Sequence, residues 1–275
     1  MTTTQSTLRS KVLWSVVGWL VVFVFFFPVL WMWLEGLKTE QQAASSPPTI
    51  FFVPTLMQFQ EVLSGDFPPF FIKSAIASLV STLLVLVLGL PAAYALAIRP
   101  VKRTQDVLFF FISTRFLPFA ASLVPLYLLA RDAHLLDNIL ALILIYTTIN
   151  LPLGVWLLRS FLLEIPHDLF EAARVDGATF RHEILRIVVP LIAPGLAATS
   201  LTCLIFSWNE FFYAVNFTSS VAATAPIFLV SFISGRGLFY AKLAAAATLA
   251  SLPVLLAGWI AQKQLIRGLT MGAVK

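Results

Sequence analysis

The side chains best suited to a specific chemical task lie in the stretch Glu171-Ala172-Ala173-Arg174-Val175-Asp176-Gly177-Ala178, inside a chain that is otherwise mostly apolar. Its charged groups can pair with charges on another protein, while alanine and glycine allow that protein to approach the backbone closely. The stretch therefore predicts a docking element for a soluble partner. The candidate contact residues are Glu171, Ala172, Ala173, Asp176, Gly177 and Ala178.

The local pattern predicts two helices joined by a bend. Pro166 suits the first turn of a helix, where its missing N–H costs nothing. Glu171 and Arg174 are three residues apart and can pair on one helix face. Gly177 is the usual residue type at a left-handed helix end, and a second helix can begin near Thr179. An amphipathic connector lying on the lipid surface is the alternative, although alanine is too small to anchor it well.

A second group of polar side chains falls inside strongly apolar runs and predicts a path for a polar solute. A tryptophan beside hydrogen-bonding groups suits a sugar, whose ring has an apolar face and a rim of hydroxyls. Each residue also has a plainer interpretation: Arg115 can reach back to the interface, Asn150 can bond a neighbouring helix, and Glu210 can lie near the outer surface. The candidates are Asn150, Trp208, Asn209, Glu210 and Arg115.

Motifs for catalysis, metal binding and phosphate binding are absent from the sequence. It contains no G-x-x-x-x-G-K-[ST], G-x-S-x-G, H-E-x-x-H or C-x-x-C. Its three histidines are scattered, and Cys203 is alone in an apolar run. We therefore expect no metal site and no catalytic residues, and we expect any energy source to lie in another protein.

Composition places the chain among membrane proteins. Of its 275 residues, 59% are hydrophobic and 11% are charged, and the mean hydropathy is +0.92. Soluble domains carry about 25% charged residues. The pI of about 9.6 could suggest nucleic acid, but the basic residues are dispersed at the ends of apolar runs, where they act as topology signals.

The hydropathy pattern predicts an all-α, six-span protein forming one permease domain over residues 1–275. The first run is longer than the core of a cleaved signal peptide, so it is expected to remain as a span. Loops carrying most of the Lys and Arg alternate with loops poor in them, which predicts that both termini are cytoplasmic and that Glu35–Phe70 lies outside. The predicted spans are 12–34, 72–98, 107–130, 138–163, 188–212 and 243–261, with 164–187 as a cytoplasmic segment.

The polar stretch also resembles a known family signature. Glu171-Ala172-Ala173 and Asp176-Gly177-Ala178, followed by Ile187 and Pro190, are similar to the EAA motif of permease subunits of ABC importers. The tail Gln264–Lys275 and Trp208-Asn209-Glu210-Phe211 resemble the maltose-type, MalG-like carbohydrate permeases.

This resemblance implies a type I ABC importer permease in a bacterial cell membrane. It implies a hetero-oligomer of two different permease chains, two cytoplasmic ATPase subunits that bind ATP and Mg, and an extracytoplasmic solute-binding protein. The polar stretch would be the coupling helix, with Glu171 contacting the ATPase and Gly177 setting the bend. No cofactor is expected in this chain itself.

Other transport classes remain open at this point. Within ABC importers, a glycerol-phosphate-type or other polar solute is the alternative to a sugar. An ion-coupled secondary transporter would show internal repeats and buried ionisable residues, and no clear repeat is visible. A membrane-embedded enzyme would need a cluster of catalytic side chains at one depth, which the sequence does not offer.

Overall fold

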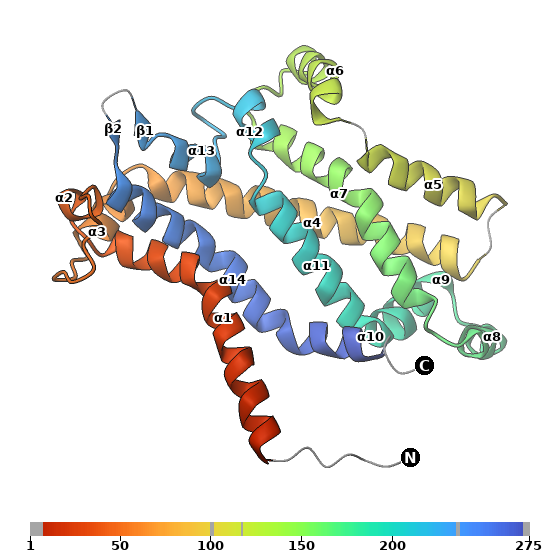
Figure 1. The fold of residues 1–275 in the computed structure, drawn as a ribbon. Helices are drawn as coiled ribbons and strands as arrows, with labels where there is room; N and C mark the ends of the chain where they lie inside the picture. The colour runs from red at the N-terminus through yellow and green to blue at the C-terminus, as the bar shows by residue number, and fades with distance from the viewer. Residues whose placement is uncertain (1–7, 100–101, 117, 235–236, 272–275) are drawn as a thin grey trace. The chain divides into compact units, whose positions relative to one another are not determined.

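The computed structural model describes residues 8–99, 102–116, 118–234 and 237–271 (Figure 1). They are helical throughout except for loops and one two-stranded antiparallel hairpin, in which Ile233 pairs with Leu238 and Ser234 with Gly237. The helices are α1 (Leu8–Gly36), α2 (Glu40–Ala43), α3 (Met57–Ser64), α4 (Phe67–Ala97), α5 (Thr104–Arg115), α6 (Phe119–Asp132), α7 (Ile139–Leu162), α8 (His167–Val175), α9 (Phe180–His182), the π-helix η1 (Glu183–Val188), α10 (Val189–Leu191), α11 (Ala193–Trp208), α12 (Phe212–Phe217), α13 (Ala225–Val230) and α14 (Tyr240–Met271), with strands β1 (Ile233–Ser234) and β2 (Gly237–Leu238).

Four of the described helices are long and apolar enough to cross a membrane by themselves. They run over Ser10–Gly36, Phe67–Ala97, Ile139–Leu162 and Tyr240–Gln262. Two bent helix pairs, in 104–132 and in 180–208, raise the number to six when each pair is counted as one span. The all-α, six-span prediction agrees with this architecture.

Two predicted spans are not single helices, and proline explains both interruptions. The span predicted at 107–130 is divided into α5 and α6, and Pro118 precedes α6 as its N-cap residue. The span predicted at 188–212 breaks at Ile192, where α10 and α11 meet in a bend of 82°. Pro194 follows at the start of α11. Proline has no N–H to donate and its ring clashes with the preceding residues in a helical conformation, so the helix cannot continue through this point. The remaining boundaries and the single-domain assignment stay predictions.

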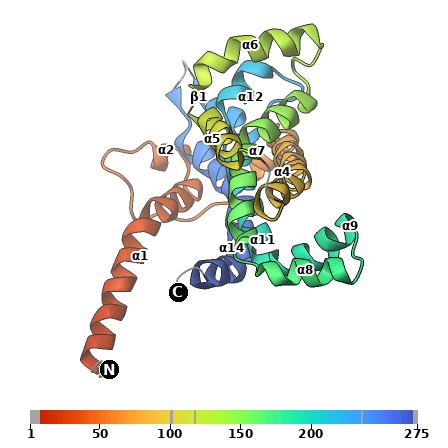
Figure 2. The ribbon, with the colours of Figure 1, turned by 90° about the vertical axis from the view of Figure 1, so that its right-hand side faces the viewer.

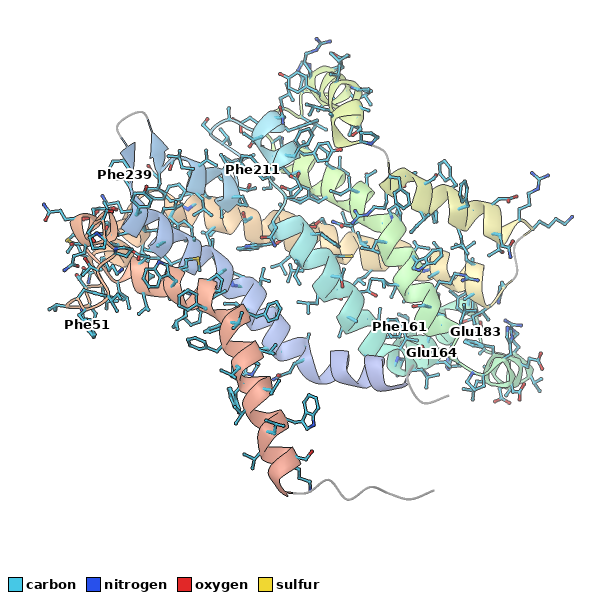
Figure 3. The ribbon with its side chains drawn as sticks, in the orientation of Figure 1. Phe51, Phe161, Glu164, Glu183, Phe211 and Phe239 are labelled. Atoms are coloured by element: carbon cyan, nitrogen blue, oxygen red, sulfur yellow. The ribbon has the colours of Figure 1, made fainter. Side chains whose placement is uncertain are left out.

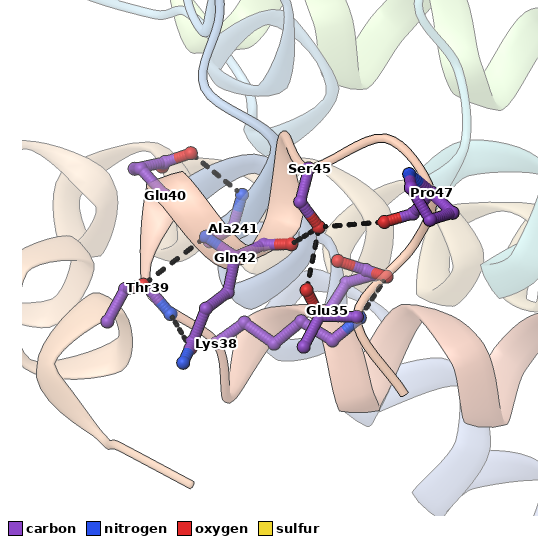
Figure 4. A network of polar contacts seen from close by, with 9 residues as sticks. Glu35, Lys38, Thr39, Glu40, Gln42, Ser45, Pro47 and Ala241 are labelled. Carbon is purple, nitrogen blue, oxygen red and sulfur yellow. Dashed lines mark hydrogen bonds and ion pairs between the residues drawn. The ribbon is translucent and has the colours of Figure 1, made fainter. Parts of the chain in front are cut away.

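The chain forms two compact units, of which the first comprises Met1–Phe67 and Leu229–Ala250. Within it, Glu40 accepts hydrogen bonds from the first N–H groups of α14, Ala241 at 3.1 Å and Lys242 at 2.9 Å (Figure 4). A carboxylate at this position satisfies donors that have no partner inside the helix. Lys38 is buried and bonds Glu35 at 2.6 Å.

The second unit comprises Pro68–Phe228 and Ser251–Lys275 and contains the residues singled out from the sequence. Within it α11 packs along α7, and the two helices lie side by side in Figures 1 and 2. One apolar cluster joins the C-terminal half of α4 to α7, α8 and η1 through Tyr94, Leu158 and Phe170. Because Phe170 belongs to α8, this cluster packs the helix that carries the predicted docking stretch against α4 and α7.

Candidate functional site

The predicted helix, glycine bend and second helix are all present in the segment 164–187. Pro166 is the N-cap residue of α8, and Asp176 is its C-cap residue. Gly177 has a φ of +76°, and the N–H of Ala178 donates to the carbonyl of Ala173 at 2.9 Å. Because L side chains rarely adopt this backbone conformation, glycine is the residue that lets the chain turn here. Thr179 then accepts a hydrogen bond from the N–H of His182 and begins the second helix.

The exposed face of this segment differs from the prediction in one residue. Glu171, Ala172, Asp176 and Gly177 are exposed, and Ala178 is half-buried. Ala173 is buried against the chain itself, so it lies on the inner face of the segment, and its predicted contact with a partner is not accessible here. Leu169, which is half-exposed, and Val175, which is 88% exposed, extend the outward apolar surface. Sequence reasoning gave Val175 no part in this surface, because it assigned the contact to the small residues.

Arg174 bonds a different carboxylate from the one predicted. Its Nε donates to Glu183 at 3.3 Å, across the glycine bend, rather than pairing with Glu171 in the same helix. The hydroxyl of Tyr94, and with it the negative charge of Glu183, raises the pKa of Arg174 above its ordinary value. Arg174 therefore holds the two helices together and leaves Glu171 directed outward.

Glu183 is a functional candidate that the sequence did not single out. Glu183, labelled in Figure 3, lies at the start of η1. It is fully buried and also accepts a hydrogen bond from Tyr94 of α4. No spacing rule connects three residues that lie at positions 94, 174 and 183. The only signal in the sequence was a carboxylate placed next to an apolar run.

A cavity of about 490 Å³ lies among the described residues of the second unit. Of the five residues predicted for a solute path, Arg115 lines it and the other four do not. Arg115 donates to the carbonyl of Ile149 at 2.7 Å and lies over the ring of Phe206, at 5.1 Å from its centroid. The cavity is lined by Leu88, Phe110, Phe111, Thr114, Arg115, Ser122, Leu126, Leu144, Thr147, Thr148, Ile149, Leu151, Pro152 and Tyr213.

Sequence reasoning missed the lining hydroxyls, of which two bond each other across the cavity wall. Those of Ser122 and Tyr213 lie 2.6 Å apart in a hydrogen bond. They come from α6 and α12, so their meeting depends on the packing of helices far apart in the chain. Together with Arg115 they give the cavity hydrogen-bonding groups among mostly apolar walls, which is the usual composition of a small-molecule site.

Asn150 and Trp208 do not line this cavity. Asn150 is fully buried, and its amide donates to Tyr146 O and to Ser207 Oγ, both at 3.0 Å. This is the helix–helix hydrogen bond that was the alternative to a solute contact, and α7 continues through Pro152 without a break. Trp208 is buried edge-on against Phe71, with ring centroids 5.4 Å apart.

Asn209 and Glu210 form helix ends. Asn209 is the exposed C-cap residue of α11, and its amide donates back to Ile205 O at 2.9 Å. Glu210 accepts from the N–H groups of Tyr213 and Ala214 at 2.8 and 3.1 Å, and so satisfies the beginning of α12. The structure therefore assigns these two residues a structural task, and their role toward a solute stays a prediction.

Comparison with known sequences gives one family and close relatives. The family described as "Binding-protein-dependent transport system inner membrane component" matches residues 85–270. A probable ABC transporter permease protein, y4oR of Sinorhizobium fredii, is 39% identical over 273 residues, covering 99% of this chain and 98% of the relative. The trehalose transport system permease protein SugB of Mycobacterium tuberculosis is 34% identical over 275 residues, covering 97% of this chain and 98% of the relative.

The fold is also found in a solved structure. A bacterial ABC transporter involved in the import of the acidic polysaccharide alginate contains a chain that superposes with a TM-score of 0.76 at 20% identity. The match covers 96% of this chain and 99% of that chain. At this identity the likeness establishes the fold alone.

Proposed function

This chain belongs to the family of binding-protein-dependent transport system inner membrane components, and we propose that it is the permease subunit of an ATP-driven importer of sugars or glycosides. The observation that carries the proposal is the exposed turn of 164–187. Glu171, Ala172 and Asp176 face outward around a glycine bend, within a chain whose helices are otherwise apolar.

The proposed mechanism assigns this chain the gate and assigns ATP hydrolysis to partners. Two cytoplasmic ATPase subunits supply the energy, a second permease chain completes the pore, and an extracytoplasmic binding protein delivers the solute. The segment 164–187 lies in the cytoplasm and seats on one ATPase subunit. When the ATPase subunits close, α8 moves with them and the spans change from inward-open to outward-open.

Sugar is the favoured substrate class. The relative from Mycobacterium tuberculosis is a trehalose permease, and the structural match comes from an importer of a polysaccharide. The cavity beside Arg115 supplies hydroxyls and a guanidinium among apolar side chains, which suits a polyol. Arg115 equally suits a phosphate or carboxylate, so a glycerol-phosphate-type solute is the second candidate.

The test is purification and reconstitution of the complex. A tagged chain, extracted in mild detergent, should bring down an ATPase subunit, and the complex in liposomes should take up a sugar only with ATP and binding protein present. A panel of disaccharides, glycosides and glycerol phosphate identifies the substrate. Uptake by this chain alone, driven by an ion gradient, would establish a secondary transporter instead.

The docking role of Glu171 has its own test. Glu171→Lys is expected to abolish ATPase retention and uptake while the protein still inserts, because the reversed charge faces the partner directly. The matched control is Asp106→Lys, which reverses another exposed carboxylate, on α5. Equal retention of ATPase in the two variants would contradict the seating of α8.

A further inference from the structure

Glu183 is a buried carboxylate to which the mechanism above assigns no task. Its side chain is 0% exposed, and burial of an unpaired carboxylate is strongly unfavourable. It is paired here by Tyr94 Oη, which donates to it, by Arg174 Nε at 3.3 Å, and by Arg99 Nη2 at 3.9 Å. These partners come from α4, from α8 and from the residues just after α4.

Aromatic contacts also join α4 to α8 and α9. The buried ring of Tyr94 meets Phe170 of α8 and Phe180 of α9 edge-on, with centroids 5.9 and 5.5 Å apart. The guanidinium of Arg99 lies 6.0 Å from the centroid of Phe180. Residues on both sides of the glycine bend are thus attached to one tyrosine on a long apolar helix.

These contacts connect α8 to a membrane span by a route other than the backbone. The chain leaves α8 through Gly177, where an added Cβ would meet no atom within 4 Å, so no side chain packs against the bend and the backbone alone connects α8 to α9 there. Movement of α8 is therefore passed on to a membrane span only if a second attachment joins α8 to that span. The charged hydrogen bonds of Glu183 supply that attachment, since such bonds are stronger and more directional than neutral ones.

We propose that Glu183 is the positioning residue that transmits movement of α8 to α4, with Tyr94 as its contact on the span. This inference rests on the proposed function, because it takes α8 as the element that the ATPase moves. Glu183 touches neither solute nor ATPase in this assignment, and it acts through Tyr94 and Arg174.

The experiment measures coupling in the complete complex in liposomes, as solute taken up per ATP hydrolysed. Glu183→Gln removes the charge at constant size, and Tyr94→Phe removes the hydroxyl and keeps the aromatic contacts. Each variant is expected to retain the ATPase subunits and ATP hydrolysis but to lose uptake per ATP by roughly tenfold, the size expected from one hydrogen bond to a charged group. The double variant should be no worse than the poorer single variant, because both changes remove one interaction.

Matched controls are Asp106→Asn, an exposed carboxylate, and Tyr240→Phe, a half-exposed tyrosine, which should leave coupling unchanged. If Glu183→Gln does not fold, Tyr94→Phe still decides the matter. Unchanged uptake per ATP in Tyr94→Phe, or loss of the ATPase from either variant, would overturn the inference. A wild-type complex that shows no ATP-dependent uptake would instead overturn the proposed function itself.

Discussion

Gly177 is the residue on which the shape of the segment 164–187 depends most directly. Its φ of +76° lies where a non-glycine residue is strained, and no neighbouring atom would obstruct a side chain. The cost of a substitution is therefore in the backbone, at roughly 1–2 kcal/mol, and it is larger for β-branched residues. The strain is relieved by a change of the bend, which would move α8 relative to α9.

We expect Gly177→Val to abolish uptake while the protein still inserts and accumulates. Uptake by whole cells and the amount of protein in membranes are the two measurements. Gly258→Val is the control, because Gly258 also has open space around an added Cβ but lies inside α14 at an ordinary helical φ. Normal uptake in Gly177→Val would show that the bend is not needed.

Asp137, just before α7, holds the loop that follows α12. Its carboxylate accepts from Ser219 Oγ at 2.7 Å and from the N–H groups of Val221 and Ala222 at 3.0 and 2.9 Å. Partial burial acts to raise the pKa of Asp137, but these hydrogen bonds outweigh it and hold the pKa well below its ordinary value. The ionised form is therefore the one that stabilises the loop.

A lowered pKa predicts a definite pH dependence. The stability that Asp137 contributes is fully present above its unfolded-state pKa of about 4, and it is lost as the pH falls through the folded-state pKa. Asp137→Asn should lower the unfolding temperature at pH 7, and its difference from wild type should shrink toward pH 3. Asp132→Asn, on an exposed carboxylate beside Arg131, should change little. A deficit that is equal at both pH values would contradict this assignment.

At the scale of elements, α4 and α7 approach so closely that a single methyl group matters. A Cβ on Gly154 would lie 2.4 Å from Val85 Cγ1, whereas one on Gly89 would have its nearest neighbour, Leu158 Cδ1, at 3.5 Å. Valine has few alternative rotamers in a helix, so it cannot move aside. The two helices would have to separate.

We therefore expect Gly154→Ala to destabilise the protein in detergent by roughly 1–3 kcal/mol, the usual cost of overpacking. Gly89→Ala should be neutral or slightly stabilising, because alanine favours the helix. Val85→Ala combined with Gly154→Ala should recover most of the loss. Thermal unfolding measures all three, and a Gly154→Ala variant as stable as wild type would contradict the close approach.

At the scale of the whole molecule, the orientation in the membrane decides whether the segment 164–187 can meet a cytoplasmic ATPase as proposed. The chain has one cysteine, Cys203, which is fully buried and can be replaced in Cys203→Ala to remove background labelling. Val53→Cys and Val175→Cys then report the two sides, since both positions are more than 80% exposed. The first lies in the loop predicted outside and the second lies in α8.

We expect a membrane-impermeant maleimide to label Val53→Cys in intact cells and Val175→Cys only after permeabilisation. The reverse pattern would place α8 outside the cell and would exclude its contact with a cytoplasmic ATPase. Labelling is read as a mass shift on the purified chain, with Cys203→Ala alone as the unlabelled reference.

Features set by local pattern were visible in the sequence. Long apolar runs predicted the membrane-spanning helices, because hydrocarbon excludes unpaired backbone groups and allows few other structures. Pro166, Gly177 and Thr179 marked the helix, the bend and the next helix start, since each acts on the backbone at its own position. Of the tail Gln264–Lys275, which contributed to the family resemblance, residues 272–275 lie outside the described residues.

Pairings between distant helices were decided by the tertiary structure alone. By sequence, Arg174 was predicted to pair with Glu171, three residues away. The packing of the helices pairs it with Glu183 instead. Asn150 meets Ser207, and Ser122 meets Tyr213, because α7, α11, α6 and α12 come together in the second unit. Sequence alone therefore established the membrane class and the glycine bend, since both follow from composition and from residues close together in the chain. The buried carboxylate that attaches this bend to α4 became visible only in three dimensions, because hydrogen bonds between residues about 90 positions apart leave no periodicity in the chain.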